Sequence, residues 1–218
     1  MDADAISEVL LKRNKKICTL KDILALTSKA TYLSTLSKLI NSKWIIPIKG
    51  FRGVYYVVDP EEHLRSYFKL SNFQVLIKVL NAVLGNEWYF GRMSALNILG
   101  LIHQPVSTYY VINKKFSKEF TSRIFGKIIL VNSSAKLISS CGILTKKYKG
   151  DNYKVCTVER NMADYLYFYV HGHSDKEQIE NFYKNYIPDK KKVINIIARC
   201  YPKESAIKMK TAIGTVVK

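Results

Sequence analysis

The chain contains 218 residues, with 35 Lys or Arg against 17 Asp or Glu and a formal net charge of +18. This charge favours an acidic polymer or an acidic protein surface as partner, although a lysine-rich composition is also typical of AT-rich genomes. A hydrophobic fraction of 48% suffices for one sizeable core or two small ones. Because no apolar run reaches roughly eighteen residues and the chain starts with acidic residues, we expect neither a membrane span nor a secretory signal, and a cytoplasmic protein.

Residues 19 to 29 predict a short helix followed by a turn. Thr19 is a suitable N-cap, and the apolar residues Leu20, Ile23 and Leu24 fall on one side of the helix. The polar run at residues 27–29 then interrupts the apolar pattern for long enough to form a turn.

A second helix is predicted from about residue 30 to residue 42. The apolar positions expected to face its core are Leu33, Leu36 and Ile40. The residues expected on the opposite side are Thr31, Thr35, Lys38 and Ser42. Short hydroxyls and a lysine can approach base edges and phosphates in a major groove without filling it, as a recognition helix requires.

A β-hairpin is predicted next, from two β-rich runs at residues 44–48 and 54–58. The turn between them contains glycines at its bend. Lys49 and Arg52 lie at the tip, where a wing would meet the phosphate backbone.

Together these elements predict a winged helix-turn-helix DNA-binding domain over residues 1–62. Residues 1–58 hold ten Lys or Arg against four Asp or Glu, a net charge of +6, which favours duplex DNA over the alternative of a protein-interaction module. The predicted DNA contacts are Ser28, Lys29, Thr31, Tyr32, Thr35, Lys38, Lys49 and Arg52.

A second domain is predicted over residues 63–218, because Pro60 and the polar run after it indicate a connector. Ser71 should cap a helix that ends at Gly85, and the aromatic run at residues 88–90 should enter a short helix that Gly100 ends. Strands are expected at residues 108–112, 124–131, 143–148 and 153–158, and further helices at residues 159–170, 176–186, 189–199 and 203–212. The predicted fold class is α+β, with the winged helix followed by a mixed α+β domain.

The second domain contains no residue pattern that indicates a catalytic site. Glu159 and Asp164 would point about 140° apart on a helix, so they cannot jointly hold a metal. No phosphate-binding loop and no nucleophile motif is found. Arg92, beside the aromatic run, is compatible with a nucleotide pocket, but we favour a core role for that run. His171 and His173 lack further ligands at suitable spacing. We therefore expect no enzyme, no metal and no cofactor.

The four cysteines are Cys18, Cys141, Cys156 and Cys200, without any C-x-x-C spacing. We expect reduced, buried thiols.

The last thirty residues are basic, with eight Lys or Arg against two Asp or Glu. The tentative partner-binding residues there are Lys190, Lys191, Lys192 and Arg199. This region is either a solvated helix face, a contact for further DNA phosphates, or a contact for an acidic protein surface.

Several motifs resemble the AbiEi family of abortive-infection antitoxins and related transcriptional regulators, over about residues 5–170. They are the run at residues 42–55, Trp88-Tyr89-Phe90, Ser94-Ala95-Leu96, and Thr157-Val158-Glu159-Arg160 with Asp164. The resemblance implies an autorepressor whose winged helix binds repeats in its own promoter, and whose C-terminal domain neutralises a nucleotidyltransferase-like toxin. Two alternatives stay open. One is a stand-alone regulator whose second domain senses a ligand or oligomerises, and the other is a nucleic-acid enzyme. The sequence leaves the oligomeric state open.

Overall fold

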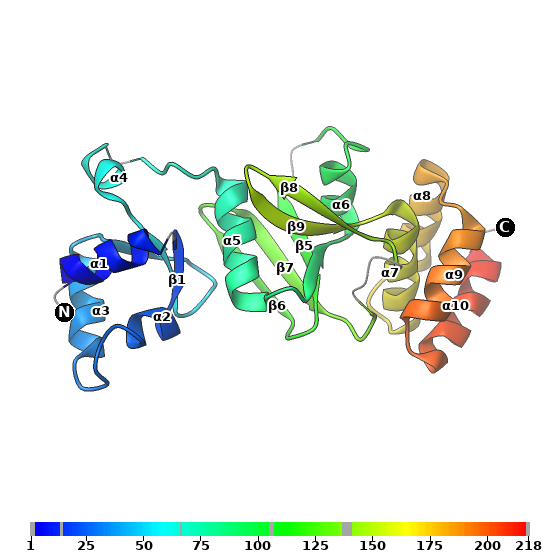
Figure 1. Ribbon diagram of the computed structural model, residues 1–218. Coiled ribbons are helices and arrows are strands. Elements are labelled where there is room, and N and C mark those ends of the chain that lie inside the picture. Colours follow the sequence, from blue (N-terminus) through cyan, green and yellow to red (C-terminus); the bar gives the residue numbers. More distant parts are fainter. Residues whose placement is uncertain (1–2, 14, 66, 105–106, 137–140, 217–218) are drawn as a thin grey trace. The chain divides into compact units, whose positions relative to one another are not determined.

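The computed structural model describes residues 3–13, 15–65, 67–104, 107–136 and 141–216. These residues form ten helices and two sheets, so the predicted α+β class is confirmed (Figure 1). The chain divides into a first unit, Met1–Gly85 with Thr121–Phe125, and a second unit, Asn86–Phe120 with Gly126–Lys218. The first unit thus continues past residue 62. The boundary at residue 62 stays a prediction about which segment folds independently.

The first unit contains helices and a small antiparallel sheet with the strand order β1-β3-β2. Its elements are α1 (Ala3–Lys12), β1 (Ile17–Thr19), α2 (Leu20–Leu24), α3 (Tyr32–Asn41), β2 (Ile45–Pro47), β3 (Val54–Val57), α4 (Pro60–Arg65) and α5 (Asn72–Leu84).

Local sequence explains where these helices start. The backbone N–H and the hydroxyl of Thr19 donate to the Asp22 carboxylate at 2.8 and 2.9 Å, which confirms Thr19 as the start of α2. Ser71 accepts from the backbone N–H of Gln74 and confirms the predicted start of α5. The core beneath includes Ile6, Leu10, Cys18, Ile23, Leu39, Ile45, Tyr55 and Val57. Residues from α1, α2, α3 and all three strands therefore share one apolar cluster.

Lys16 ties the sheet to α4. Its ammonium lies 2.8 Å from the Asp59 carboxylate and 2.7 Å from that of Glu62, whose side chain is fully buried. Glu62 also accepts from the Tyr56 hydroxyl and from the backbone N–H of Lys69. Burial by itself would raise the pKa values of Asp59 and Glu62, but the hydrogen bonds, first of all those from Lys16, outweigh it and lower both pKa values.

The second unit is built on a mixed six-stranded sheet with the order β6-β7-β5-β4-β9-β8, except that Thr121 and Ser122 at the end of β6 belong to the first unit. Its elements are β4 (Trp88–Phe90), α6 (Arg92–Ile98), β5 (Thr108–Asn113), β6 (Lys118–Ser122), β7 (Gly126–Asn132), β8 (Ile143–Tyr148), β9 (Asp151–Cys156), α7 (Val158–Val170), α8 (Lys176–Tyr186), α9 (Lys190–Cys200) and α10 (Lys203–Val216).

Two strands differ from the sequence prediction. The aromatic run forms β4, an inner strand that pairs antiparallel with β5 and parallel with β9, instead of leading directly into a helix. All three of its side chains are buried. β6 was not predicted, since its charged and polar residues show no apolar alternation.

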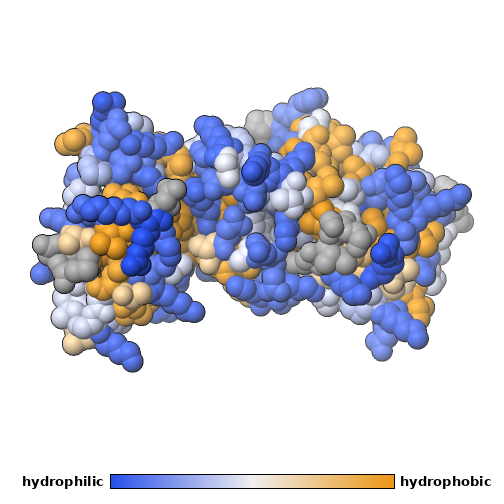
Figure 2. All heavy atoms as spheres, in the orientation of Figure 1, coloured by the Kyte–Doolittle hydropathy of each residue, from blue (hydrophilic) through white to orange (hydrophobic). Residues whose placement is uncertain are grey.

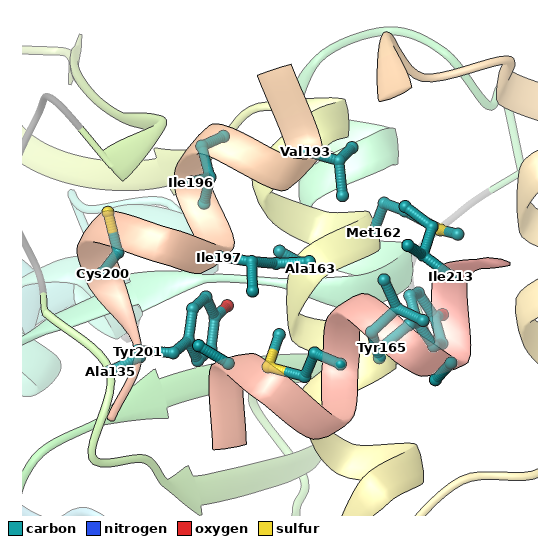
Figure 3. Packing of buried hydrophobic residues seen from close by; sticks show 14 of the residues in the cluster. Ala135, Met162, Ala163, Tyr165, Val193, Ile196, Ile197, Cys200, Tyr201 and Ile213 are labelled. Atoms are coloured by element: carbon teal, nitrogen blue, oxygen red, sulfur yellow. The ribbon is translucent and has the colours of Figure 1, made fainter. Parts of the chain in front are cut away.

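Helix α7 is the centre of the C-terminal helices, and α8, α9 and α10 pack against it. Its residues Met162 and Ala163 lie in one apolar cluster with Val193 and Ile197 of α9 and Ile213 of α10 (Figure 3). Among the described residues, no helix has the length and apolar character needed to cross a membrane.

A buried ion pair lies within this helix, and hydrogen bonds of its two side chains connect the helix to the sheet. Arg160 Nε lies 3.2 Å from the Asp164 carboxylate, with both side chains removed from solvent. The hydroxyls of Tyr89 and Tyr201 donate to the same carboxylate. Arg160 also donates to the backbone oxygen of Cys141 at 3.2 Å. Burial raises the pKa values of both tyrosines well above their ordinary value, which keeps the two hydroxyls protonated as donors.

The expectation of four reduced thiols is corrected. Cys141 and Cys200 form a disulfide, with 5.8 Å between their Cα atoms. Cys18 and Cys156 are free and buried, as predicted. Burial, followed by the nearby charge of Asp22, raises the pKa of the Cys18 thiol to about 12. The sequence did not indicate this bond, because its two cysteines lie 59 residues apart.

Lys16→Met should lower the free energy of unfolding by about 3 kcal/mol, because it leaves the buried Glu62 carboxylate without its cation. In the wild type, Asp59 and Glu62 have lowered pKa values. Their contribution is therefore present above the unfolded pKa of about 4 and is lost as the pH falls towards the folded values. In the variant this loss should begin at higher pH. Urea unfolding followed by tryptophan fluorescence, from about pH 3 to 7, measures both effects.

Lys12→Met is the matched control, because the ion pair of Lys12 with Glu8 is exposed and should contribute little. Equal stability losses in the two variants would contradict the role of Lys16.

Protein purified without reductant should show two reactive thiols per chain in denaturant, because only Cys18 and Cys156 are free. Cys141→Ser should show three, since it releases Cys200. Reduction should lower the free energy of unfolding by roughly 2–4 kcal/mol. Four thiols in the unreduced wild type would show that the bond does not form.

Candidate nucleic-acid interface

Helix α3 packs on the first unit's core through one face. Thr35 and Leu39 are buried, and Leu36 and Ile40 pack against the core cluster from its edge. Tyr32 is half-buried on the same side. These positions follow the three- and four-residue spacing of a helix.

The faces of α3 are rotated relative to the prediction. Leu33, expected in the core, is 64% exposed, and Thr35, expected to read bases, is only 8% exposed. Thr35 is therefore withdrawn as a DNA contact. The residues that α3 exposes are Leu33, Ser34, Ser37, Lys38 and Asn41. Leu39 was the missed signal, because including it in the apolar set moves the core side away from Leu33.

The turn before α3 is polar and exposed. Ser28, Lys29 and Thr31 are all exposed, as predicted. The Ser28 and Thr31 hydroxyls lie 2.7 Å apart, and the Ser34 hydroxyl donates to the Thr31 backbone oxygen at 2.8 Å. These local bonds order the N-terminal end of α3, which in a major-groove complex is the end nearest the bases.

The hairpin between β2 and β3 has a short, anchored tip. Lys49 and Arg52 are exposed there, as predicted, whereas Phe51 between them is buried. Gly53 adopts a φ of 73°, and its backbone oxygen accepts from Leu20 at 2.7 Å. A Cβ at this position would touch the Leu20 side chain at 3.4 Å. The two cations are thus presented on a turn that packs against the start of α2.

Charge is distributed unevenly over the first unit. Lys15, Lys16 and Lys69 form ion pairs with acidic side chains. In contrast, within the described part of the chain, no ion pair is formed by the exposed cations Lys29, Lys38, Lys43, Lys49 and Arg52. Arg13, Lys21 and Arg123 of the first unit are likewise exposed and form no ion pair among the described residues. The positive charge available to an external partner therefore includes α3, the turns that flank it and the hairpin tip, but is not confined to them.

The second predicted surface lies on α9. Lys190, Lys191, Lys192 and Arg199 are all exposed. Asp189 caps the helix by accepting from the backbone N–H groups of Lys191 and Lys192 at 2.9 and 3.2 Å. Lys192 and Arg199 fall on one side of the helix, seven residues apart, whereas Lys190 points about 180° away from Arg199. Hydrophilic residues dominate the C-terminal helices on the face shown in Figure 2. Lys218, also counted as basic, lies outside the described residues.

An exposed hydrophobic residue precedes these lysines. Ile187 is 76% exposed. It ends α8 with a φ of 42°, a left-handed conformation that is unfavourable for a β-branched residue.

The carboxylates considered for catalysis do not act together. Asp164 is buried in its bonds to Arg160 and two tyrosines, and Glu159 is a first-turn acid of α7. Over the described ranges, no group of three His, Cys, Asp or Glu side chains is placed to hold a metal. His171 instead interacts with the Ser205 hydroxyl at 3.1 Å.

The chain matches no protein-family model and no curated protein sequence.

Proposed function

We propose that the first unit binds duplex DNA as a winged helix-turn-helix. The observation that carries the proposal is the order α1-β1-α2-α3-β2-β3 with the sheet β1-β3-β2, combined with unpaired cations on α3 and on the β2–β3 turn. In a winged helix, the helix after the turn enters the major groove and the hairpin contacts the adjacent backbone. The corresponding elements here are α3 and the turn that carries Lys49 and Arg52.

The exposed side chains divide into two roles. Ser34, Ser37 and Asn41 are short and polar, and an asparagine can pair with adenine through two hydrogen bonds. They are the proposed base contacts. Lys29, Lys49 and Arg52 would contact phosphates, which sets position and affinity without reading sequence.

We further propose that the protein is a cytoplasmic repressor of its own promoter and the antitoxin of a toxin pair. The support is the resemblance to AbiEi-like regulators together with the composition of the α9 surface. There, exposed Ile187 lies three residues before Lys190, so an apolar contact and a cluster of lysines adjoin. Such a surface suits an acidic protein with an apolar spot. The alternative remains a stand-alone regulator whose second unit senses a ligand.

Wing and helix variants should affect DNA binding differently. In the full-length protein, Lys49→Ala and Arg52→Ala should weaken binding similarly on all sequences, and each should flatten the log–log salt slope by about one. Ser37→Ala and Asn41→Ala should instead change the preference among single-base operator variants by roughly 1 kcal/mol. Mobility shifts on a panel of promoter variants at several salt concentrations measure both.

Lys147→Ala is the charge-matched control, because Lys147 is an exposed lysine of β8 in the second unit. It should leave binding and salt slope unchanged. Thr35→Ala, at a buried position, should alter stability and not base preference. Equal losses of specificity from wing and helix variants would refute the assignment of α3.

Charge reversal on α9 should separate the two activities. Lys190→Glu, Lys191→Glu and Lys192→Glu together should weaken rescue of cells that express the cognate toxin while leaving promoter binding intact, because the like charges now face an acidic partner. Ile187→Ser should weaken rescue as well. Plating with the toxin, and reporter repression in the same cells, give the two readouts.

The matched control reverses three exposed cations on two other helices of the second unit, through Lys176→Glu and Lys184→Glu on α8 and Lys203→Glu on α10. If the α9 reversal abolishes repression and spares rescue, α9 serves DNA and the stand-alone regulator becomes the better interpretation.

A further inference from the structure

The second unit contains a cavity of about 610 Å³ between β6, β7 and the C-terminal end of α7. Pockets of several hundred cubic ångströms are the usual size for small-molecule ligands. The side chains that decide its chemistry are Arg92, Lys118, Glu119, Tyr167, His171 and His173.

Arg92 is held in a costly backbone conformation. Its φ is 50°, in the left-handed region that favours glycine. The buried Asn161 side chain fixes it from both sides, accepting from the Arg92 backbone N–H at 2.7 Å and donating to the Arg92 backbone oxygen at 2.9 Å. Glycine would adopt this backbone conformation without strain, whereas arginine adopts it at a cost in free energy. Residues held in such strained conformations cluster at functional sites.

The Arg92 guanidinium has aromatic neighbours and no counter-charge. Its central carbon lies 4.8 Å from the ring centre of Phe168, 5.3 Å from that of Tyr110 and 5.5 Å from that of Tyr165. Its Nη2 donates to the Ser174 hydroxyl at 3.2 Å, and its buried Nε has no acceptor. Within the described ranges, no carboxylate lies within 4.0 Å of it. The rings stabilise the cation in part, but a partly buried charge still favours an anion.

The cavity also contains a second cation and further polar side chains. Lys118, His171 and His173 line it, and the one carboxylate among its described lining residues, Glu119, forms an ion pair with Lys127 at 2.6 Å. The sheet side is apolar, with Ile129 and its neighbours on β7. The cavity therefore combines a cationic part with an apolar wall next to the Tyr167 ring.

We propose that this cavity binds a small phosphorylated organic molecule, a phosphate monoester whose planar or apolar portion lies against β7 and Tyr167. Arg92 would donate to the phosphate oxygens, with Lys118 and the two histidines supplying further donors. A monoester is preferred over a single carboxylate because it carries about two negative charges at neutral pH, and two cations, Arg92 and Lys118, line the same cavity. The proposal is independent of DNA binding by the first unit.

Calorimetric titration of the full-length protein with AMP, inorganic phosphate, adenosine and succinate tests the proposal. AMP should bind most tightly, inorganic phosphate more weakly, and adenosine hardly at all. Arg92→Met keeps the bulk of the side chain without its charge and should weaken AMP binding by about tenfold or more. Lys184→Met, which removes an exposed cation from outside the cavity, should bind AMP like the wild type.

A second variant tests the proposal if Arg92→Met does not fold. Lys118 is exposed on its strand, so Lys118→Gln should fold, and it should weaken AMP binding severalfold. The double variant Lys49→Ala and Arg52→Ala should retain full AMP binding, which separates this cavity from the proposed DNA surface.

Several results would overturn the proposal. They are no AMP binding up to about 5 mM, equal affinity for AMP and adenosine, tighter binding of succinate than of AMP, or AMP affinity that is unchanged in both Arg92→Met and Lys118→Gln. Loss of AMP binding in the wing double variant alone would assign the phosphate contact to the DNA surface.

Discussion

The second unit depends on the ion pair between Arg160 and Asp164. An isolated charge in this interior would cost several kcal/mol, so each partner is tolerable only while the other is present. The remaining donors and acceptors come from different elements: Tyr89 from β4, the Cys141 backbone before β8, and Tyr201 after α9. The pair thereby fixes one relative placement of strand, loop and helix. The aromatic run and the Glu-Arg segment, distant in sequence, meet in this network, since Arg160 donates to the Tyr89 hydroxyl at 3.1 Å.

The first unit uses its acidic residues differently. Asp59 and Glu62 neutralise Lys16 and secure α4 to the sheet, while Asp22 neutralises Lys15 and starts α2. These acidic side chains therefore neutralise lysines within the fold, while exposed cations on α3 and on the β2–β3 turn form no ion pair among the described residues. The division between paired and unpaired cations indicates more than the net charge does, because only the unpaired ones are available to an external partner.

Features that depend on a short stretch of sequence could be predicted, whereas features that depend on tertiary packing could not. The caps Thr19 and Ser71 and the glycine turn before β3 could be identified because a short sequence determines them. The face of α3 could not, because a helix with apolar residues at positions 33, 36, 39, 40 and a tyrosine at 32 offers two overlapping apolar sides, and only the neighbouring elements choose between them. Arg92 drew notice in the sequence beside the aromatic run, but its surroundings could not be predicted, since they come from β5, α7 and the loop that contains Ser174.

The disulfide between Cys141 and Cys200 closes a covalent ring that contains β8, β9, α7, α8 and α9. The exposed turn at residues 171–175 lies inside that ring. A protease that cuts there would produce two pieces that stay joined through the sulfur atoms, with α7 and α9 still side by side. In an oxidising medium the two pieces would therefore stay covalently linked after the cut. In a reducing medium the disulfide would be reduced, and no covalent bond would then hold the C-terminal piece to the rest of the protein.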